Sequence, residues 1–233
     1  MNHFRLLAAS AILLVGTAAE AYPLDGFPTS GIRRLELVRL RVEGALPGTA
    51  PPPGGRRPLS DVHLRLTAGA GVPLDALPAP DEALQARLDA LFPNRDESYS
   101  VSLLDITPGR PLRCAGRQQD RTFSPGSVGK IAVASGLFAE LARRFPDDLE
   151  ARGRLLQERM VTADHWIGKD RHPIPFFDLA DSAFVSRPAR AGDVFSLLEW
   201  ADHMMSASAN SAASTVWKEV MLMRALGDAY PPT

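Results

Sequence analysis

The chain has 233 residues, of which 45% are hydrophobic, and a formal net charge of -1. Its length suits one ordinary globular domain with an extension, and the near-neutral charge gives no electrostatic basis for binding nucleic acid or a membrane surface. The charge therefore predicts no nucleic-acid partner and no membrane contact beyond a signal peptide, and we expect a monomer. Cys114 is the only cysteine, which excludes an intrachain disulfide and a cysteine-based metal site.

The first 21 residues have the pattern of a signal peptide. Arg5 supplies a positive charge, residues 6–15 form a short apolar run, and the sequence AEA at residues 19–21 matches a signal-peptidase site. The apolar run is too short to span a bilayer comfortably, although an uncleaved anchor is the alternative. The pattern predicts cleavage after Ala21 and a periplasmic or secreted protein.

Residues 22–80 are predicted to form an N-terminal arm. An amphipathic segment, GIRRLELVRLRVEG, leads into ALPGTAPPPGGRRP, a Pro/Gly-rich loop that cannot form a helix or an inner strand. The segment DVHLRL, at residues 61–66, alternates apolar and polar side chains as a strand does.

Residues 81–233 are predicted to form a partial domain that begins with a helix and a hairpin. DEALQARLDALF has leucines at helical spacing behind an Asp81 cap. YSVSLLDI and PLRCAG are two β-rich runs separated by TPGR, and the second run buries Cys114. The next helix follows Ser127 and ends before Pro146. Its predicted buried face consists of Ile131, Ala134, Leu137, Phe138 and Leu141.

Further helices are predicted in the last third of the chain. DDLEARGRLLQERM indicates one helix, HWIGKDRHPIPFFD is loop-like because of its two prolines, and AGDVFSLLEWADHMM is helical again. SASAN interrupts the helical pattern, and SAASTVWKEVMLMRAL resumes it. The order helix, hairpin, helices predicts the α+β class.

Ser127 and Lys130 form a candidate catalytic pair. A serine hydroxyl is a weak nucleophile unless a neighbouring base takes its proton, and residues three apart on a helix share a face. Lys130 can therefore lie beside the Ser127 hydroxyl and act as that base. The alternative is that Ser127 is only the N-cap of the helix and Lys130 is solvated.

Ser208 and Asn210 form a second motif, Ser-Ala-Asn, at the edge of a helix. A hydroxyl and an amide from one turn suit proton transfer to a leaving nitrogen and hydrogen bonding to a substrate amide. The alternative is an ordinary turn between two helices.

Together the motifs Phe123-x-x-x-Ser127-x-x-Lys130 and Ser208-x-Asn210 resemble those of the serine β-lactamase and penicillin-binding protein superfamily, closest to class A-like serine hydrolases. The resemblance implies a β-lactamase/DD-peptidase-like fold, with a helical domain and an antiparallel sheet. It also implies that Ser127 is acylated, that Lys130 activates it, that Ser208 shuttles a proton to the leaving nitrogen, and that Asn210 binds the substrate amide and Lys130. The implied substrate is a β-lactam or a peptidoglycan peptide, with no cofactor and no metal.

The resemblance covers residues 81–226, and the chain departs from the superfamily pattern in several places. Ala209 stands where β-lactamases often carry Asp, and the Lys-Thr-Gly strand of the superfamily is missing, because Lys169 precedes Asp and Lys218 precedes Glu. We therefore expect a C-terminally truncated member that lacks the closing strands.

Other functions stay open. A peptidoglycan DD-peptidase and a non-catalytic β-lactam- or peptidoglycan-binding domain fit the same motifs. An α/β-hydrolase elbow would need Gly at position 125, where the chain has Pro, and an apolar strand before it. A metal site would use Asp164, His165, Asp170 and His172, whose spacing matches no standard ligand set.

Overall fold

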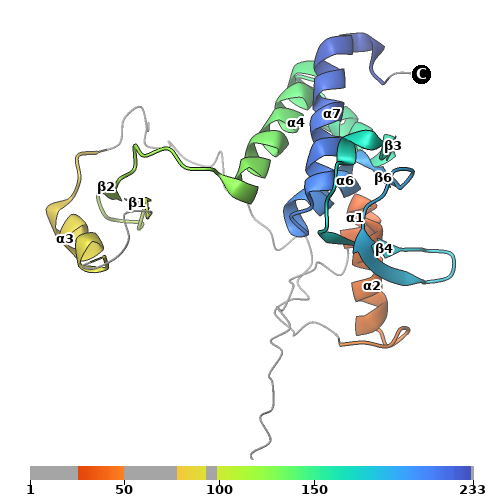
Figure 1. Ribbon diagram of the computed structural model, residues 1–233, viewed down its shortest axis with the longest axis horizontal. Coiled ribbons are helices and arrows are strands. Elements are labelled where there is room, and N and C mark those ends of the chain that lie inside the picture. The colour runs from red at the N-terminus through yellow and green to blue at the C-terminus, as the bar shows by residue number, and fades with distance from the viewer. Residues whose placement is uncertain (1–25, 50–77, 93–98, 232–233) are drawn as a thin grey trace, which may run out of the picture. The chain divides into compact units, whose positions relative to one another are not determined.

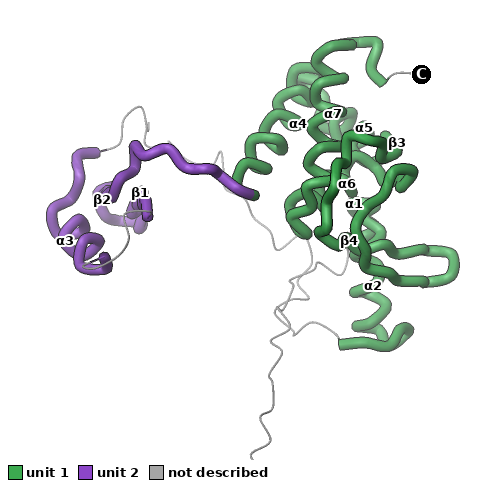
Figure 2. Tube along the Cα trace, viewed as in Figure 1, with its two compact units in different colours: residues 1–63, 127–233 green, residues 64–126 purple. Residues whose placement is uncertain are grey.

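The computed structural model describes residues 26–49, 78–92 and 99–231 (Figure 1). The predicted signal peptide and the predicted strand at residues 61–66 lie outside these residues. The described part of the chain is α+β, as predicted, with helices and small antiparallel sheets. The chain divides into two compact units (Figure 2). Unit 2 is Leu64–Gly126, and unit 1 contains Met1–His63 and Ser127–Thr233.

Unit 2 contains one helix and one hairpin among its described residues, α3 (Glu82–Ala90), β1 (Val101–Asp105) and β2 (Arg113–Arg117). The Asp81 carboxylate accepts a hydrogen bond of 2.8 Å from the Leu84 amide, so it caps α3 as predicted. The strands β1 and β2 pair antiparallel, which confirms the predicted hairpin. Cys114 lies buried on β2 as a free thiol, and its carbonyl accepts from the Asp81 amide at 2.9 Å.

Unit 1 is mainly helical. Its elements are α1 (Gly26–Ser30), α2 (Arg33–Val42), α4 (Lys130–Arg144), α5 (Leu149–Glu158), β3 (Met160–Thr162), β4 (Pro173–Phe177), β5 (Phe184–Pro188), β6 (Val194–Ser196), α6 (Leu197–Ser206) and α7 (Asn210–Leu226). The strands form two-stranded antiparallel pairs, β3 with β6 and β4 with β5. No helix in the described ranges is long and apolar enough to cross a membrane.

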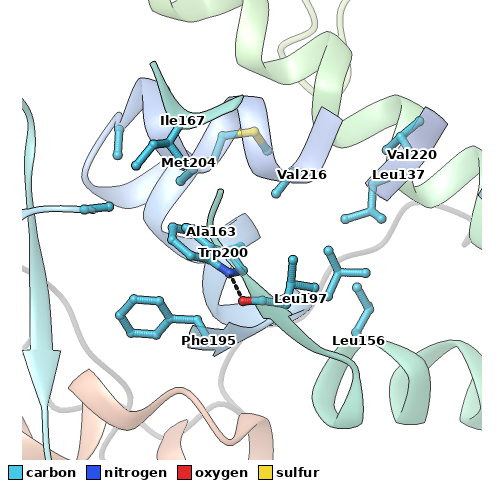
Figure 3. Packing of buried hydrophobic residues seen from close by; sticks show 14 of the residues in the cluster. Leu137, Leu156, Ala163, Ile167, Phe195, Leu197, Trp200, Met204, Val216 and Val220 are labelled. Atoms are coloured by element: carbon cyan, nitrogen blue, oxygen red, sulfur yellow. Dashed lines mark hydrogen bonds between the residues drawn. The ribbon is translucent and has the colours of Figure 1, made fainter. Parts of the chain in front are cut away.

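The core of unit 1 lies among α4, α6 and α7, with α5 and the short strands at its side (Figure 3). Trp200 on α6 is completely buried, and its indole Nε1 donates a hydrogen bond of 2.9 Å to the Val161 carbonyl. Leu137 on α4 and Val216 on α7 are also fully buried. Each such side chain contributes about 1.5–3 kcal/mol through the hydrophobic effect.

Glu219, at the centre of α7, is a buried charge with two partners. Its carboxylate is 1% exposed, accepts a hydrogen bond of 2.6 Å from the Tyr230 hydroxyl, and lies 3.3 Å from Arg159 Nε. Burial and the adjacent carboxylate raise the pKa of Tyr230 above its usual range. A buried carboxylate needs such partners because its desolvation is costly.

The helix α2, from the N-terminal arm, packs on the rest of unit 1 and forms ion pairs with α6. Arg33 Nε lies 2.8 Å from Glu199 Oε1, and Arg34 Nε lies 2.5 Å from Asp202 Oδ2. Glu199 also closes a capping box with Ser196 at the start of α6. The amphipathic segment of the arm therefore docks on the outside of the helical core, against α6 and β4.

The buried face of α4 differs from the predicted one. Leu137 and Leu141 are fully buried, but Ile131 and Phe138 are 56% and 55% exposed, so their predicted burial is wrong. The buried residues of α4 instead include Lys130 and Leu137, which come directly before Ile131 and Phe138 in the sequence. Successive helical residues are about 100° apart, so Ile131 and Phe138 lie beside the stripe that faces α6 and α7.

The segment PIPFF, predicted to be a loop, forms the strand β4. It pairs with β5 from Pro173 opposite Pro188 to Phe177 opposite Phe184. Proline cannot donate to a strand ladder, but a two-stranded sheet leaves one edge of each strand without a ladder partner. Ile174 is fully buried in the core, and Phe176, on the same face of the strand, packs against it, which explains why this proline-containing segment is ordered as a strand.

Candidate active site

Ser127 lies in a 3-10 turn, Gly126–Gly129, that leads directly into α4. The N-cap of α4 is Gly129, and no side chain caps this helix end. The alternative in which Ser127 merely caps the helix is therefore not observed. The residues before the turn form no strand, so the strand that a hydrolase elbow requires is also not found at residues 118–125. The Ser127 side chain is exposed and free to meet a ligand.

Lys130, the first residue of α4, contacts the other three site residues. The residue is only 7% exposed, and its Nζ lies within hydrogen-bond distance of four oxygens. Three belong to side chains, Ser127 Oγ at 3.1 Å, Ser208 Oγ at 3.2 Å and Asn210 Oδ1 at 2.8 Å, and the fourth is the Ser208 carbonyl at 2.7 Å. A buried amine needs such partners because transfer out of water is costly without them.

Ser208 lies in the short connection between α6 and α7 and has an unusual backbone conformation. Its φ is 54°, in the left-handed region that non-glycine residues rarely occupy. Such a conformation costs on the order of 1–3 kcal/mol and tends to be kept where a site requires it. Here both the carbonyl and the hydroxyl of Ser208 contact Lys130, and the hydroxyl donates a hydrogen bond of 2.9 Å to Ser127 Oγ.

Asn210 is the first residue of α7, and its side chain is oriented by Lys130. Because its Oδ1 accepts from Lys130 Nζ, its amide nitrogen faces another direction. That nitrogen has no hydrogen-bond partner in the part of the chain that the structure describes. It can therefore donate to a carbonyl oxygen of a ligand.

All four predicted site residues thus lie in one hydrogen-bonded cluster built from the beginnings of α4 and α7. The distance from Ser127 Oγ to Lys130 Nζ is within the range for proton transfer, and Ser208 Oγ contacts both atoms. Chemically, the cluster offers an exposed hydroxyl, a buried amine beside it and a second hydroxyl that links the two.

Asp170 is a residue of this site that our sequence analysis treated only as a possible metal ligand. Its carboxylate is 3% exposed and accepts from the Ser211 amide at 2.8 Å and the Ser211 hydroxyl at 3.0 Å. His172 Nδ1 lies 2.6 Å from the other oxygen. Burial raises the pKa of Asp170, but the hydrogen bonds from Ser211 and His172 outweigh it and hold the pKa below its usual range.

The four residues considered as an alternative metal site do not form one cluster. Asp164 pairs with Lys218 at 2.8 Å, whereas Asp170 bonds with Ser211 and His172. Across residues 26–49, 78–92 and 99–231, no three His, Cys, Asp or Glu side chains are arranged to hold a metal ion.

Comparisons with protein-family models, with curated proteins and with solved structures found no match to this chain. The interpretation of the site therefore depends on its geometry and on the two motifs that build it.

Proposed function

We propose that this protein is an exported serine hydrolase of β-lactamase type, with Ser127 as the nucleophile that attacks an amide or β-lactam carbonyl. The observation that carries the proposal is the contact of Lys130 Nζ with Ser127 Oγ at 3.1 Å, made by an amine that is held by Ser208 and Asn210. A serine beside a positioned base is the minimum apparatus for acyl transfer.

In the proposed reaction Lys130 takes the Ser127 proton while Oγ forms a bond with the carbonyl carbon. The tetrahedral intermediate collapses as the carbon–nitrogen bond breaks. The leaving nitrogen receives a proton from Ser208, which is replenished by the proton that Lys130 accepted, because Ser208 Oγ lies 3.2 Å from Lys130 Nζ. Ser127 is left as an ester, and the Asn210 amide nitrogen holds an amide carbonyl of the substrate.

The fold that we propose for the helical part is the β-lactamase/DD-peptidase-like one. Its support is the placement of the two motifs, Ser-x-x-Lys at the beginning of α4 and Ser-x-Asn at the beginning of α7, with their side chains in contact. The same placement would serve a peptidoglycan DD-peptidase.

A fluorescent penicillin tests the proposal. We expect the full chain to gain one covalent adduct on Ser127, detected by intact mass and by peptide mapping. Ser127→Ala should abolish the adduct, whereas Ser135→Ala, at an exposed serine on the same helix, should leave it unchanged. Thermal melting verifies that both variants are folded. An adduct that persists in the Ser127 variant would show that the nucleophile is another residue.

The fate of the adduct separates the related functions. Release of an opened β-lactam with repeated turnover indicates a β-lactamase, and release of D-alanine from a peptidoglycan pentapeptide indicates a DD-peptidase. An adduct that forms once and persists, with no peptide cleavage, indicates a binding domain.

A further inference from the structure

We propose that Asp170 is a positioning residue of this site. Its carboxylate fixes the first turn of α7, and this turn carries the oxygens that hold Lys130 beside Ser127. The consequence for catalysis rests on the proposed function, whereas the effect on the position of Lys130 does not.

The beginning of α7 needs a hydrogen-bond acceptor that its own sequence does not provide. The first amides of any helix have no partner within the helix. Ala209 occupies the N-cap position of α7 and has no polar side chain to accept from them. Asp170, 41 residues earlier in the chain, accepts instead from the Ser211 amide. Its negative charge also complements the positive end of the helix dipole.

Asp170 is itself held rigidly. One carboxylate oxygen accepts from both the amide and the hydroxyl of Ser211. The other oxygen accepts a hydrogen bond of 3.1 Å from the backbone amide of His172 and lies 2.6 Å from Nδ1 of its ring. Because the carboxylate is only 3% exposed, water does not compete freely for these contacts.

The turn that Asp170 fixes is the turn that positions Lys130. Asn210, directly before Ser211, supplies Oδ1 to Lys130 Nζ, and Ser208 supplies its carbonyl. Loss of the Asp170 carboxylate leaves the amide and hydroxyl of Ser211 buried without this acceptor, since Ser211 is 0% exposed. The turn then has to shift or fray, and Lys130 loses the geometry that places it beside Ser127.

Asp164 offers a matched control. Asp164 and Asp170 both lie in the segment between β3 and β4. Asp164 also joins this segment to α7, through a contact of 2.8 Å with Lys218. It also caps a short helical turn by accepting from the Trp166 amide at 2.9 Å. Asp164→Ala therefore removes a comparable contact between the same two segments, but away from the first turn of α7.

Side-chain NMR of lysine tests the positioning directly, because the full chain contains only three lysines, at positions 130, 169 and 218. In protein labelled with ¹³C and ¹⁵N at lysine, Asp170→Ala should shift the Lys130 side-chain signals and leave those of Lys218 unchanged. Asp164→Ala should do the reverse. A Lys130 signal that is unchanged in Asp170→Ala would overturn the inference.

Acylation kinetics test the consequence. Asp170→Ala should lower the acylation rate at saturating fluorescent penicillin by about 10- to 100-fold, as expected for a displaced catalytic group. Asp170→Asn should lose less, because its amide oxygen still accepts from Ser211, and it serves as the test if the alanine variant does not fold. Asp164→Ala should stay within about twofold of wild type.

The two readouts distinguish the two proposals. If the wild-type chain takes no label while the Lys130 signals still respond to Asp170→Ala, the proposed function fails and the positioning role holds. If the wild-type chain is labelled and Asp170→Ala is labelled at the same rate, the positioning role fails.

Discussion

His203 should make the protein lose stability as the pH falls from 7 to 5. The ring is buried on α6, packs edge-on against Phe195 at 4.7 Å and Trp200 at 6.5 Å, and is 1% exposed. Neither ring nitrogen has a hydrogen-bond partner among the described residues, and Asp202 lies 3.9 Å from Nδ1. Burial lowers the pKa from 6.5 to about 4, and of the charged groups around the ring Asp202 and Glu199 raise it while Arg34 and Arg33 lower it.

The size of the effect follows from this pKa difference. Between pH 7 and pH 5 the unfolded histidine binds a proton and the folded one does not, so the unfolded state is favoured as the pH falls. With a pKa of 6.5 unfolded and about 4 folded, the loss of unfolding free energy over this interval is about 2 kcal/mol.

Urea unfolding at pH 5, 6 and 7 measures the loss. His203→Leu removes both unpartnered nitrogens at similar volume, so we expect it to be at least as stable as wild type at pH 7 and to lack about 2 kcal/mol of the pH dependence. His165→Leu, at an exposed position, should keep the wild-type dependence. If His203→Leu also keeps it, the histidine is not the group that titrates.

The other predictions concern buried groups with exposed counterparts. Leu137→Ala should lower the unfolding free energy by about 2–5 kcal/mol because the side chain is fully buried, whereas Phe138→Ala, at a half-exposed position beside it, should cost clearly less in the same urea titration. Glu219→Gln should lower the unfolding free energy by about 1–3 kcal/mol, because it removes the buried charge that pairs with the partly exposed Arg159. Glu150→Gln, in an exposed pair, should cost less than about 1 kcal/mol. Lys130→Met should lower the acylation rate by about 10²–10⁴-fold without unfolding the protein, and an unchanged rate would contradict its role as the base.

Local signals predicted much of the fold. The Asp81 cap and the TPGR turn specify α3 and the hairpin through contacts between residues close in sequence, and both are observed. The change from SASAN to a regular helical pattern likewise marked the beginning of α7. Such features are readable because the interacting groups lie within a few positions of one another.

What could not be predicted depends on segments that meet only in the folded chain. Which face of α4 is buried depends on where α6 and α7 lie, so Ile131 and Phe138 fit a helical pattern and are still exposed. The four site residues could be grouped by their motifs, but the hydrogen bond of Asp170 to Ser211 spans 41 positions and follows no local pattern. The sequence likewise could not predict that both ring nitrogens of His203 would be buried without a hydrogen-bond partner among the described residues.

The ion pairs between α2 and α6 have a consequence for synthesis. Arg33 and Glu199 are 166 positions apart, so the first of these helices leaves the ribosome long before its partner exists. At about 5–20 residues per second, α2 waits roughly 8–30 s before it can dock. During that interval Arg33 and Arg34 have no native ion-pair partner, and a chaperone or an export factor has time to bind them. The last third of the chain therefore determines when α2 can dock.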